Sequence, residues 1–228
     1  MKLSQLFHKC AYEISYSQVG DSVNYAFRYN SAEDILYIYF EGSNSISDWI
    51  RNFLFAKKPY KDMKIPYKVH RGFLAAWKEV EDIVIEKITE KDTFTGRYKW
   101  NHIVVVGYSH GAALAGLCHE CVWFYRPDLR ENGLEGYGFE APRFYAGWKV
   151  KKTLKERWAK FTIIRNKRDI VTHCPPWLFR YTHVNKVTKI GKGISTKGYK
   201  WPKCVGAHYP DKVYQSLLKW EEDQKESE

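Results

Sequence analysis

The sequence has no apolar run that approaches the ~18 residues of a membrane-spanning helix. Its first ten residues, M-K-L-S-Q-L-F-H-K-C, contain no continuous apolar core. We therefore expect no secretory signal and a cytoplasmic location, with release by another route left open. Cysteine is also sparse, because the chain has five, an odd number, at scattered positions. This favours free thiols in a reducing compartment over a disulfide framework.

Acidic residues are fewer than basic residues. The chain has 26 Asp and Glu against 37 Lys and Arg, which gives a formal net charge of +11. An anionic membrane surface or nucleic acid could bind such a charge, and a soluble protein with a basic face is the simplest alternative. Hydrophobic residues make up 44% and aromatic residues 17% of the chain, which excludes a disordered protein. The 228 residues suit one α/β domain over 1–228, and no linker divides them.

The most informative stretch is residues 102–118, H-I-V-V-V-G-Y-S-H-G-A-A-L-A-G-L-C. Its β-branched run is too short for a helix and fits a buried parallel strand, whereas the small residues after Gly111 favour a helix. A strand, sharp turn and helix around G-x-S-x-G form a nucleophile elbow, which lifts the serine, here Ser109, above the sheet. The alternative is an ordinary glycine-rich turn whose serine caps the helix.

Strand-like and helix-like patterns alternate along the rest of the chain. We expect helices over Leu3–Gln18, from Val69 to about Glu90, from the elbow to near Arg126, over Trp148–Trp158 and over Tyr209–Trp220. We expect an edge strand at Asp21–Tyr29 and further strands at Ile35–Phe40, Tyr137–Arg143 and Phe161–Arg165, with a loop at Lys57–Lys68. This order predicts an α/β fold whose mostly parallel central sheet is covered by helices on both faces.

A serine nucleophile needs a base and an acid that orients the base, and in this fold the chain order is serine, acid, histidine. Asp169 is the favoured acid because it follows a predicted strand at the edge where sites of open sheets gather. Asp128 follows a helix-ending proline and would lie at the other end of the sheet. Asp211 fits the first turn of the last helix, where the helix dipole favours it.

His208 is the favoured base, because it lies in a late loop that can reach back to the elbow. His173 shares a loop with Asp169, which leaves it little reach towards Ser109. His183 lies in an expected extended segment and is more typical of a surface or core histidine. His110 follows the nucleophile directly, so its side chain should point away from the serine hydroxyl.

Acyl transfer also needs hydrogen-bond donors for the oxyanion that forms on the substrate. One is the backbone N–H that follows the nucleophile, here that of His110. The second should come from the loop after an early strand, where Gly42 and Ser43 stand. Ser43 could offer both its N–H and its hydroxyl, and the alternative is a serine that only stabilises the turn.

Five segments, in this order, resemble the class 3 lipases, the fungal-type triacylglycerol lipase group. They are F-E-G-S-N-S-I-S-D-W-I-R-N-F, V-H-R-G-F, V-V-V-G-Y-S-H-G-A-A-L-A, Y-G-F-E-A-P-R-F and N-K-R-D-I-V-T-H-C-P-P. The resemblance implies an α/β-hydrolase fold, a triad of Ser109, Asp169 and His208, and an oxyanion hole of Ser43 with His110. It implies no cofactor and no metal.

The resemblance also gives Ile46–Leu54 the place of the family's lid. Its apolar residues fall at helical spacing on one face, so we expect a short amphipathic helix, which would be either mobile or fixed on the body. The sequence departs from the family pattern at three positions: Glu41 stands where arginine is frequent, His110 where leucine is usual, and Thr172 where proline is common. None of these changes removes a catalytic group.

The resulting hypothesis is a serine carboxyl-ester hydrolase that acts on lipid esters such as acylglycerols or phospholipids. One alternative is an esterase for small soluble or aryl esters. An alternative of another class is a basic protein that binds membrane surfaces or nucleic acid on an inactive hydrolase scaffold. The intact serine, acid and histidine argue against it, so we expect no nucleic-acid partner. Contact with an anionic membrane is compatible with hydrolysis, and the sequence leaves the oligomeric state open.

Overall fold

The structure, a computed structural model, describes residues 2–21, 23–42, 56–62, 64–167, 169–191 and 205–226. A seven-stranded sheet runs through its centre in the order β1-β2-β3-β6-β7-β9-β11. These strands are β1 (Ser17–Val19), β2 (Val23–Asn30), β3 (Ile35–Phe40), β6 (His102–Tyr108), β7 (Leu134–Phe139), β9 (Phe161–Asn166) and β11 (Val187–Ile190). All neighbours from β3 to β11 are parallel, whereas β1, β2 and β3 pair antiparallel. The predicted mostly parallel α/β fold is confirmed.

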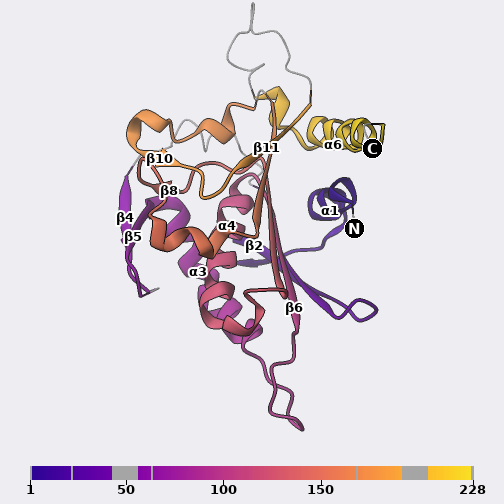
Figure 1. The fold of residues 1–228 in the computed structure, drawn as a ribbon, viewed down its shortest axis with the longest axis vertical. Coiled ribbons are helices and arrows are strands. Elements are labelled where there is room, and N and C mark those ends of the chain that lie inside the picture. Colours follow the sequence, from indigo (N-terminus) through magenta and orange to yellow (C-terminus); the bar gives the residue numbers. More distant parts are fainter. Residues whose placement is uncertain are drawn as a thin grey trace, which may run out of the picture.

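Helices cover both faces of this sheet (Figure 1). The helices α3 (Arg71–Ile88) and α4 (His110–Tyr125) pack on one face, and α1 (Leu3–His8) and α6 (Pro210–Lys225) lie side by side on the other. The arrangement explains why the sequence of β3 is apolar throughout. Leu36 and Ile38 join the core under α3 and α4, whereas Tyr37 and Tyr39 join the core under α1 and α6.

The helix α4 is almost entirely buried, because it lies between the sheet and the neighbouring helix α3. A helix in that position needs apolar or small residues all round, which matches the sequence after the elbow.

Among the described residues, no helix is both long enough and apolar enough to span a membrane.

A second, four-stranded sheet has the order β10-β8-β5-β4 and lies at the side of the molecule beyond α3 (Figure 1). Its strands are β4 (Lys57–Tyr60), β5 (Tyr67–His70), β8 (Tyr145–Ala146) and β10 (Tyr181–Thr182). The loop predicted at Lys57–Lys68 is therefore wrong. Its lysines and Pro59 are tolerated because β4 is an edge strand, where exposed charges and a missing N–H donor do little harm.

Further elements differ from expectation, among them the strand expected at Tyr137–Arg143, which is observed as β7 and ends at Phe139. The helix predicted over Leu3–Gln18 consists of α1 and one π-helical segment, η1 (Lys9–Glu13), after which the chain becomes extended and enters β1. The strand β2 is not at the edge of the sheet, because β1 pairs with its outer side. The predicted Trp148–Trp158 helix is shorter and of the 3₁₀ type, η3 (Lys152–Trp158).

The remaining 3₁₀ segments are η2 (Pro127–Leu129), η4 (Val171–His173), η5 (Trp177–Phe179) and η6 (Gly206–His208). The segments η4 and η6 matter most for function, because they follow Asp169 and contain His208 respectively. Ser43 and the predicted helix Ile46–Leu54 lie outside the described residues.

Candidate active site

Ser109 lies in a sharp turn between β6 and α4. It is buried, and its backbone has φ 55° and ψ −121°, a conformation that is unfavourable for any residue with a side chain. A Cβ atom at Gly107 would lie 2.1 Å from the Gly111 carbonyl oxygen, and one at Gly111 would lie 2.3 Å from the Phe40 carbonyl oxygen. Neither contact is tolerable, so both glycines of the G-x-S-x-G segment are required by the close approach of backbone to backbone. The turn has the geometry of a nucleophile elbow.

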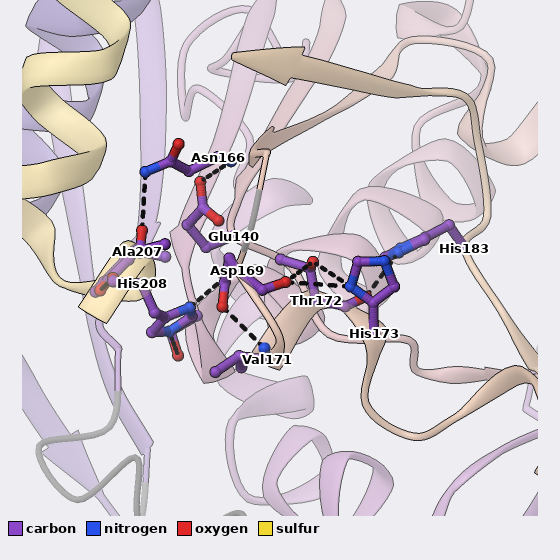
Figure 2. A network of polar contacts seen from close by, with 11 residues as sticks. Glu140, Asn166, Asp169, Val171, Thr172, His173, His183, Ala207 and His208 are labelled. Atoms are coloured by element: carbon purple, nitrogen blue, oxygen red, sulfur yellow. Dashed lines mark hydrogen bonds and ion pairs between the residues drawn. The ribbon is translucent and has the colours of Figure 1, made fainter. Parts of the chain in front are cut away.

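The three residues that sequence analysis selected as a triad lie in direct contact. Nε2 of His208 is 2.7 Å from Oγ of Ser109, and Nδ1 of His208 is 2.5 Å from Oδ2 of Asp169. Asp169 and His208 are fully buried, and Ser109 is nearly so. The residues come from three separate segments: the elbow, the loop after β9 and η6. Figure 2 shows the Asp169 carboxyl directed at the His208 ring.

Other contacts hold the acid and the base in place. Oδ1 of Asp169 accepts a hydrogen bond of 2.8 Å from the Val171 N–H, and the carbonyl of Asp169 accepts one of 2.8 Å from Thr172 Oγ1. The ring of Tyr108 stacks on that of His208 at a centroid distance of 5.4 Å, and its hydroxyl donates to the His208 carbonyl oxygen. The imidazole therefore has little freedom to turn away from Ser109.

The backbone N–H of His110 is the first of α4, and the first N–H groups of a helix have no acceptor within the helix. It therefore offers a donor beside Ser109. The side chain of His110 packs on Phe73 at a ring-centroid distance of 5.5 Å. Burial, and secondarily the neighbouring His70, lower the pKa of the His110 ring to about 4, so it is neutral near pH 7.

The other candidate histidines have different partners. Nδ1 of His173 faces the Asp169 carbonyl oxygen at 3.1 Å, and its Nε2 faces Arg165. Nε2 of His183 lies 3.0 Å from the carbonyl oxygen of Thr172, and burial lowers the pKa of His183 to about 3. Both rings belong to the network around the Asp169 loop (Figure 2), whereas the ring that contacts Ser109 is that of His208.

The other candidate acids also have partners elsewhere. Asp128 forms an ion pair of 2.7 Å with the buried Arg126. Asp211 lies in the first turn of α6, as predicted, and its Oδ1 accepts a 2.6 Å hydrogen bond from the Tyr12 hydroxyl.

Similarity to known proteins identifies the family of the chain. The family model "Lipase (class 3)" matches residues 37–179. The chain belongs to the class 3 lipase family.

Two of the curated relatives that the chain matches are fungal lipases. A lipase of Rhizomucor miehei is 30% identical over 159 residues, which are 68% of this chain and 41% of the relative. A lipase of Rhizopus oryzae is 29% identical over 179 residues, 78% of this chain and 44% of the relative. The chain thus spans less than half the length of the curated relatives it matches.

Solved structures give the same result for the fold. Rhizomucor miehei triacylglyceride lipase superposes with a TM-score of 0.63 at 25% identity, over 77% of this chain and 66% of that one. A triacylglycerol lipase whose catalytic centre is formed by a serine protease triad has a TM-score of 0.62 at 26% identity, over 77% and 65% of the two chains. A mutant form of the Penicillium cyclopium protein MDLA shares the fold, with a TM-score of 0.65 at 21% identity over 93% and 95%.

Two residues of this site had no role in the sequence analysis, Tyr108 and Glu140. Glu140 is fully buried next to Asp169, although it stood within a quoted segment, Y-G-F-E-A-P-R-F. Among the described residues four non-glycine residues have a positive φ, and Ser109 and Glu140 are two of them. A glutamate directly after an apolar strand, at the edge where the elbow serine emerges, was the sequence signal that could have revealed it.

Within the described part of the chain, one group of three residues could offer ligand atoms to a metal ion. It comprises Glu140, Asp169 and His208, whose ligand atoms all lie within 4.8 Å of one another. Asp169 and His208 already share their 2.5 Å hydrogen bond, and Nε2 of His208 faces Ser109. These atoms are engaged in a hydrogen-bonded relay, and we assign no metal site to them.

Proposed function

We propose that this class 3 lipase is a serine carboxyl-ester hydrolase that cleaves lipid esters through a covalent acyl-enzyme. The observation that carries the proposal is the contact of Ser109, His208 and Asp169 at the end of a nucleophile elbow, with hydrogen bonds of 2.7 and 2.5 Å. A serine hydroxyl is a poor nucleophile at neutral pH, and an oriented imidazole within hydrogen-bond distance is what activates it.

In the proposed mechanism Ser109 Oγ attacks the ester carbonyl while His208 Nε2 accepts its proton. Asp169 stabilises the imidazolium and keeps Nδ1 protonated, so that Nε2 is the accepting nitrogen. The oxyanion of the tetrahedral intermediate accepts a hydrogen bond from the His110 N–H, and one such donor can contribute about 3 kcal/mol. His208 then protonates the leaving alcohol. In the second half of the reaction water takes the place of the alcohol: His208 accepts its proton, the water attacks the acyl-enzyme, and Ser109 is released with a proton from His208. We assign Ser43, which lies outside the described residues, as the second oxyanion donor.

The substrate class can be tested with esters of increasing acyl length. We expect kcat/KM on p-nitrophenyl esters to rise from acetate to octanoate, by up to about fourfold per added CH₂, because each buried CH₂ contributes about 0.8 kcal/mol. Emulsified acylglycerol or phosphatidylcholine should be hydrolysed as well. An esterase for small soluble esters would instead be fastest on the acetate ester and inactive on emulsions. If the chain hydrolysed no ester at all, the proposal would be contradicted.

We further propose that the enzyme contacts anionic lipid surfaces through an apolar patch formed by Trp148, Trp177, Leu178 and Phe179. Leu178 is 72% exposed and Trp177 57% exposed, and the rings of Trp148 and Trp177 touch at a centroid distance of 4.8 Å. Arg180 lies 5.5 Å from the Trp148 ring, and Lys57 lies 5.3 Å from the ring of Tyr181, next in the chain. Apolar side chains with adjacent cations fit the interface of a membrane that contains anionic lipid.

Removal of this patch should weaken membrane binding. We expect the double variant Trp177→Ala/Leu178→Ala to bind vesicles of phosphatidylcholine with phosphatidylserine at least tenfold more weakly, because two large apolar side chains no longer leave water. Binding of the unchanged chain should fall with added salt. The control is Phe94→Ala, since Phe94 is 97% exposed in the loop before β6, away from the patch. Equal vesicle co-sedimentation of the double variant and the control would contradict this contact.

A further inference from the structure

Glu140 occupies a position that is unfavourable for a glutamate in two respects. It follows β7 with φ 53°, a backbone conformation that side-chain-bearing residues rarely adopt, and its carboxyl group is fully buried. A buried acid in a strained turn persists only where the surroundings stabilise it. Its surroundings are the residues of the triad.

The contacts of the two Glu140 oxygens differ. Oε1 accepts a hydrogen bond of 2.6 Å from the Asn166 N–H. Oε2 is buried, and no donor among the described residues reaches it. Its neighbour is the Asp169 carboxyl, which it can contact by a hydrogen bond only if one of the two groups carries a proton. Figure 2 shows Glu140 between Asn166 and Asp169.

The proton belongs on Glu140. Asp169 has hydrogen bonds from the Val171 N–H and the His208 ring, both of which favour a carboxylate. Glu140 has a single N–H donor. Burial, followed by the charge of Asp169, raises the pKa of Glu140 well above its ordinary value, although Arg165 opposes this shift. Two buried carboxyls in contact do not both ionise at neutral pH, as in other carboxyl pairs that share a proton.

We propose that Glu140 is a positioning residue for the triad, which in its protonated form donates a hydrogen bond from Oε2 to the Asp169 carboxylate and fixes it towards His208. The role rests on the proposed ester hydrolysis and extends it by a fourth residue. The Asp169 carboxylate then receives three donors, from Val171, His208 and Glu140, and among the described residues it remains the only anion in direct contact with the imidazole.

A pH dependence follows from this arrangement. The ionisable groups that face Glu140 are Asp169 and His208, with Arg165 on β9 and Tyr108 on β6. When Glu140 loses its proton at alkaline pH, its hydrogen bond to Asp169 is replaced by repulsion between two carboxylates. We therefore expect kcat/KM to fall on the alkaline side as Glu140 ionises.

The variant Glu140→Gln tests this role directly. Its amide can accept from the Asn166 N–H and donate to Asp169 at every pH, so we expect activity within about threefold of the unchanged enzyme near pH 7. The alkaline fall in kcat/KM should disappear. Glu140→Gly suits the positive φ and folds without the carboxyl, so it should lose about tenfold in kcat with little change in KM. The control is Glu135→Gln on β7, the strand that precedes Glu140. Glu135 is half-exposed at the surface, and this variant should keep the full profile.

Infrared difference spectra provide a readout that does not depend on hydrolysis. We expect the C=O stretch of a protonated carboxylic acid at neutral pH, lost in both Glu140 variants and kept in Glu135→Gln. An unchanged alkaline limb in Glu140→Gln, or spectra without a band that depends on Glu140, would overturn the proposal. If the band is found but neither the unchanged enzyme nor any variant hydrolyses esters, the protonated state of Glu140 is supported and the proposed function is contradicted.

Discussion

Replacing Ser109 by alanine should lower kcat for ester hydrolysis by on the order of 10⁴- to 10⁶-fold, the range seen when the nucleophile of a serine–histidine–acid triad is removed. The reason is the loss of the nucleophile that forms the acyl-enzyme: His208 Nε2, now 2.7 Å from the serine oxygen, would have no hydroxyl to deprotonate. The fold should persist, because alanine at φ 55° has the same backbone strain as serine.

The measurement compares initial rates on p-nitrophenyl butyrate with circular dichroism and thermal unfolding of the same samples. The matched control is Ser17→Ala, which removes a hydroxyl from the exposed strand β1 and should leave both rate and stability unchanged. A Ser109→Ala enzyme that is folded and retains a tenth or more of the activity would place the nucleophile elsewhere.

Replacing Asp169 by asparagine should lower kcat by about 10⁴-fold while binding of substrate changes little. The Val171 N–H lies 2.8 Å from Oδ1 and needs an acceptor, so the amide oxygen of the asparagine would stay there. Its NH₂ group would then face His208 Nδ1 and favour the imidazole tautomer with the proton on Nε2. That tautomer cannot accept the proton of Ser109.

The control for this change is Asp211→Asn, at an exposed position in the first turn of α6. The amide oxygen can still accept from the Tyr12 hydroxyl, which is now 2.6 Å from the Asp211 carboxylate. It should reduce activity by less than twofold. Similar rates for both asparagine variants would show that Asp169 does not control the tautomer of His208.

The elements that organise the fold could be predicted because they are buried on both sides. Strand β3 was predicted with its observed bounds, and β6 and β9 were recognised as apolar runs of strand length. The turn around Ser109 could also be predicted from the sequence, since it requires glycine two positions before and two positions after the serine. The order of serine, acid and histidine then selected two distant residues, which the structure brings into contact.

What could not be predicted depends on tertiary context. Strands β4 and β5 are held by pairing with β8 and with each other, while the local sequence at Lys57–Lys68 is basic and contains proline. Periodicity also cannot show where a short helix such as α1 gives way to a π-helical turn. Glu140 was overlooked because its sequence signal, an acid directly after a strand, does not show that the acid is buried. Its proximity to the Asp169 carboxyl is seen only in the folded structure.

The central claim, that Ser109 is an activated nucleophile, is tested most directly by reaction with a fluorophosphonate followed by peptide mass spectrometry. We expect one adduct per chain, on Ser109, and a loss of hydrolysis in proportion to the fraction of chains labelled. The Ser109→Ala variant should carry no adduct. Labelling of another residue that abolishes activity, or full hydrolysis by a chain that carries the adduct on Ser109, would contradict it.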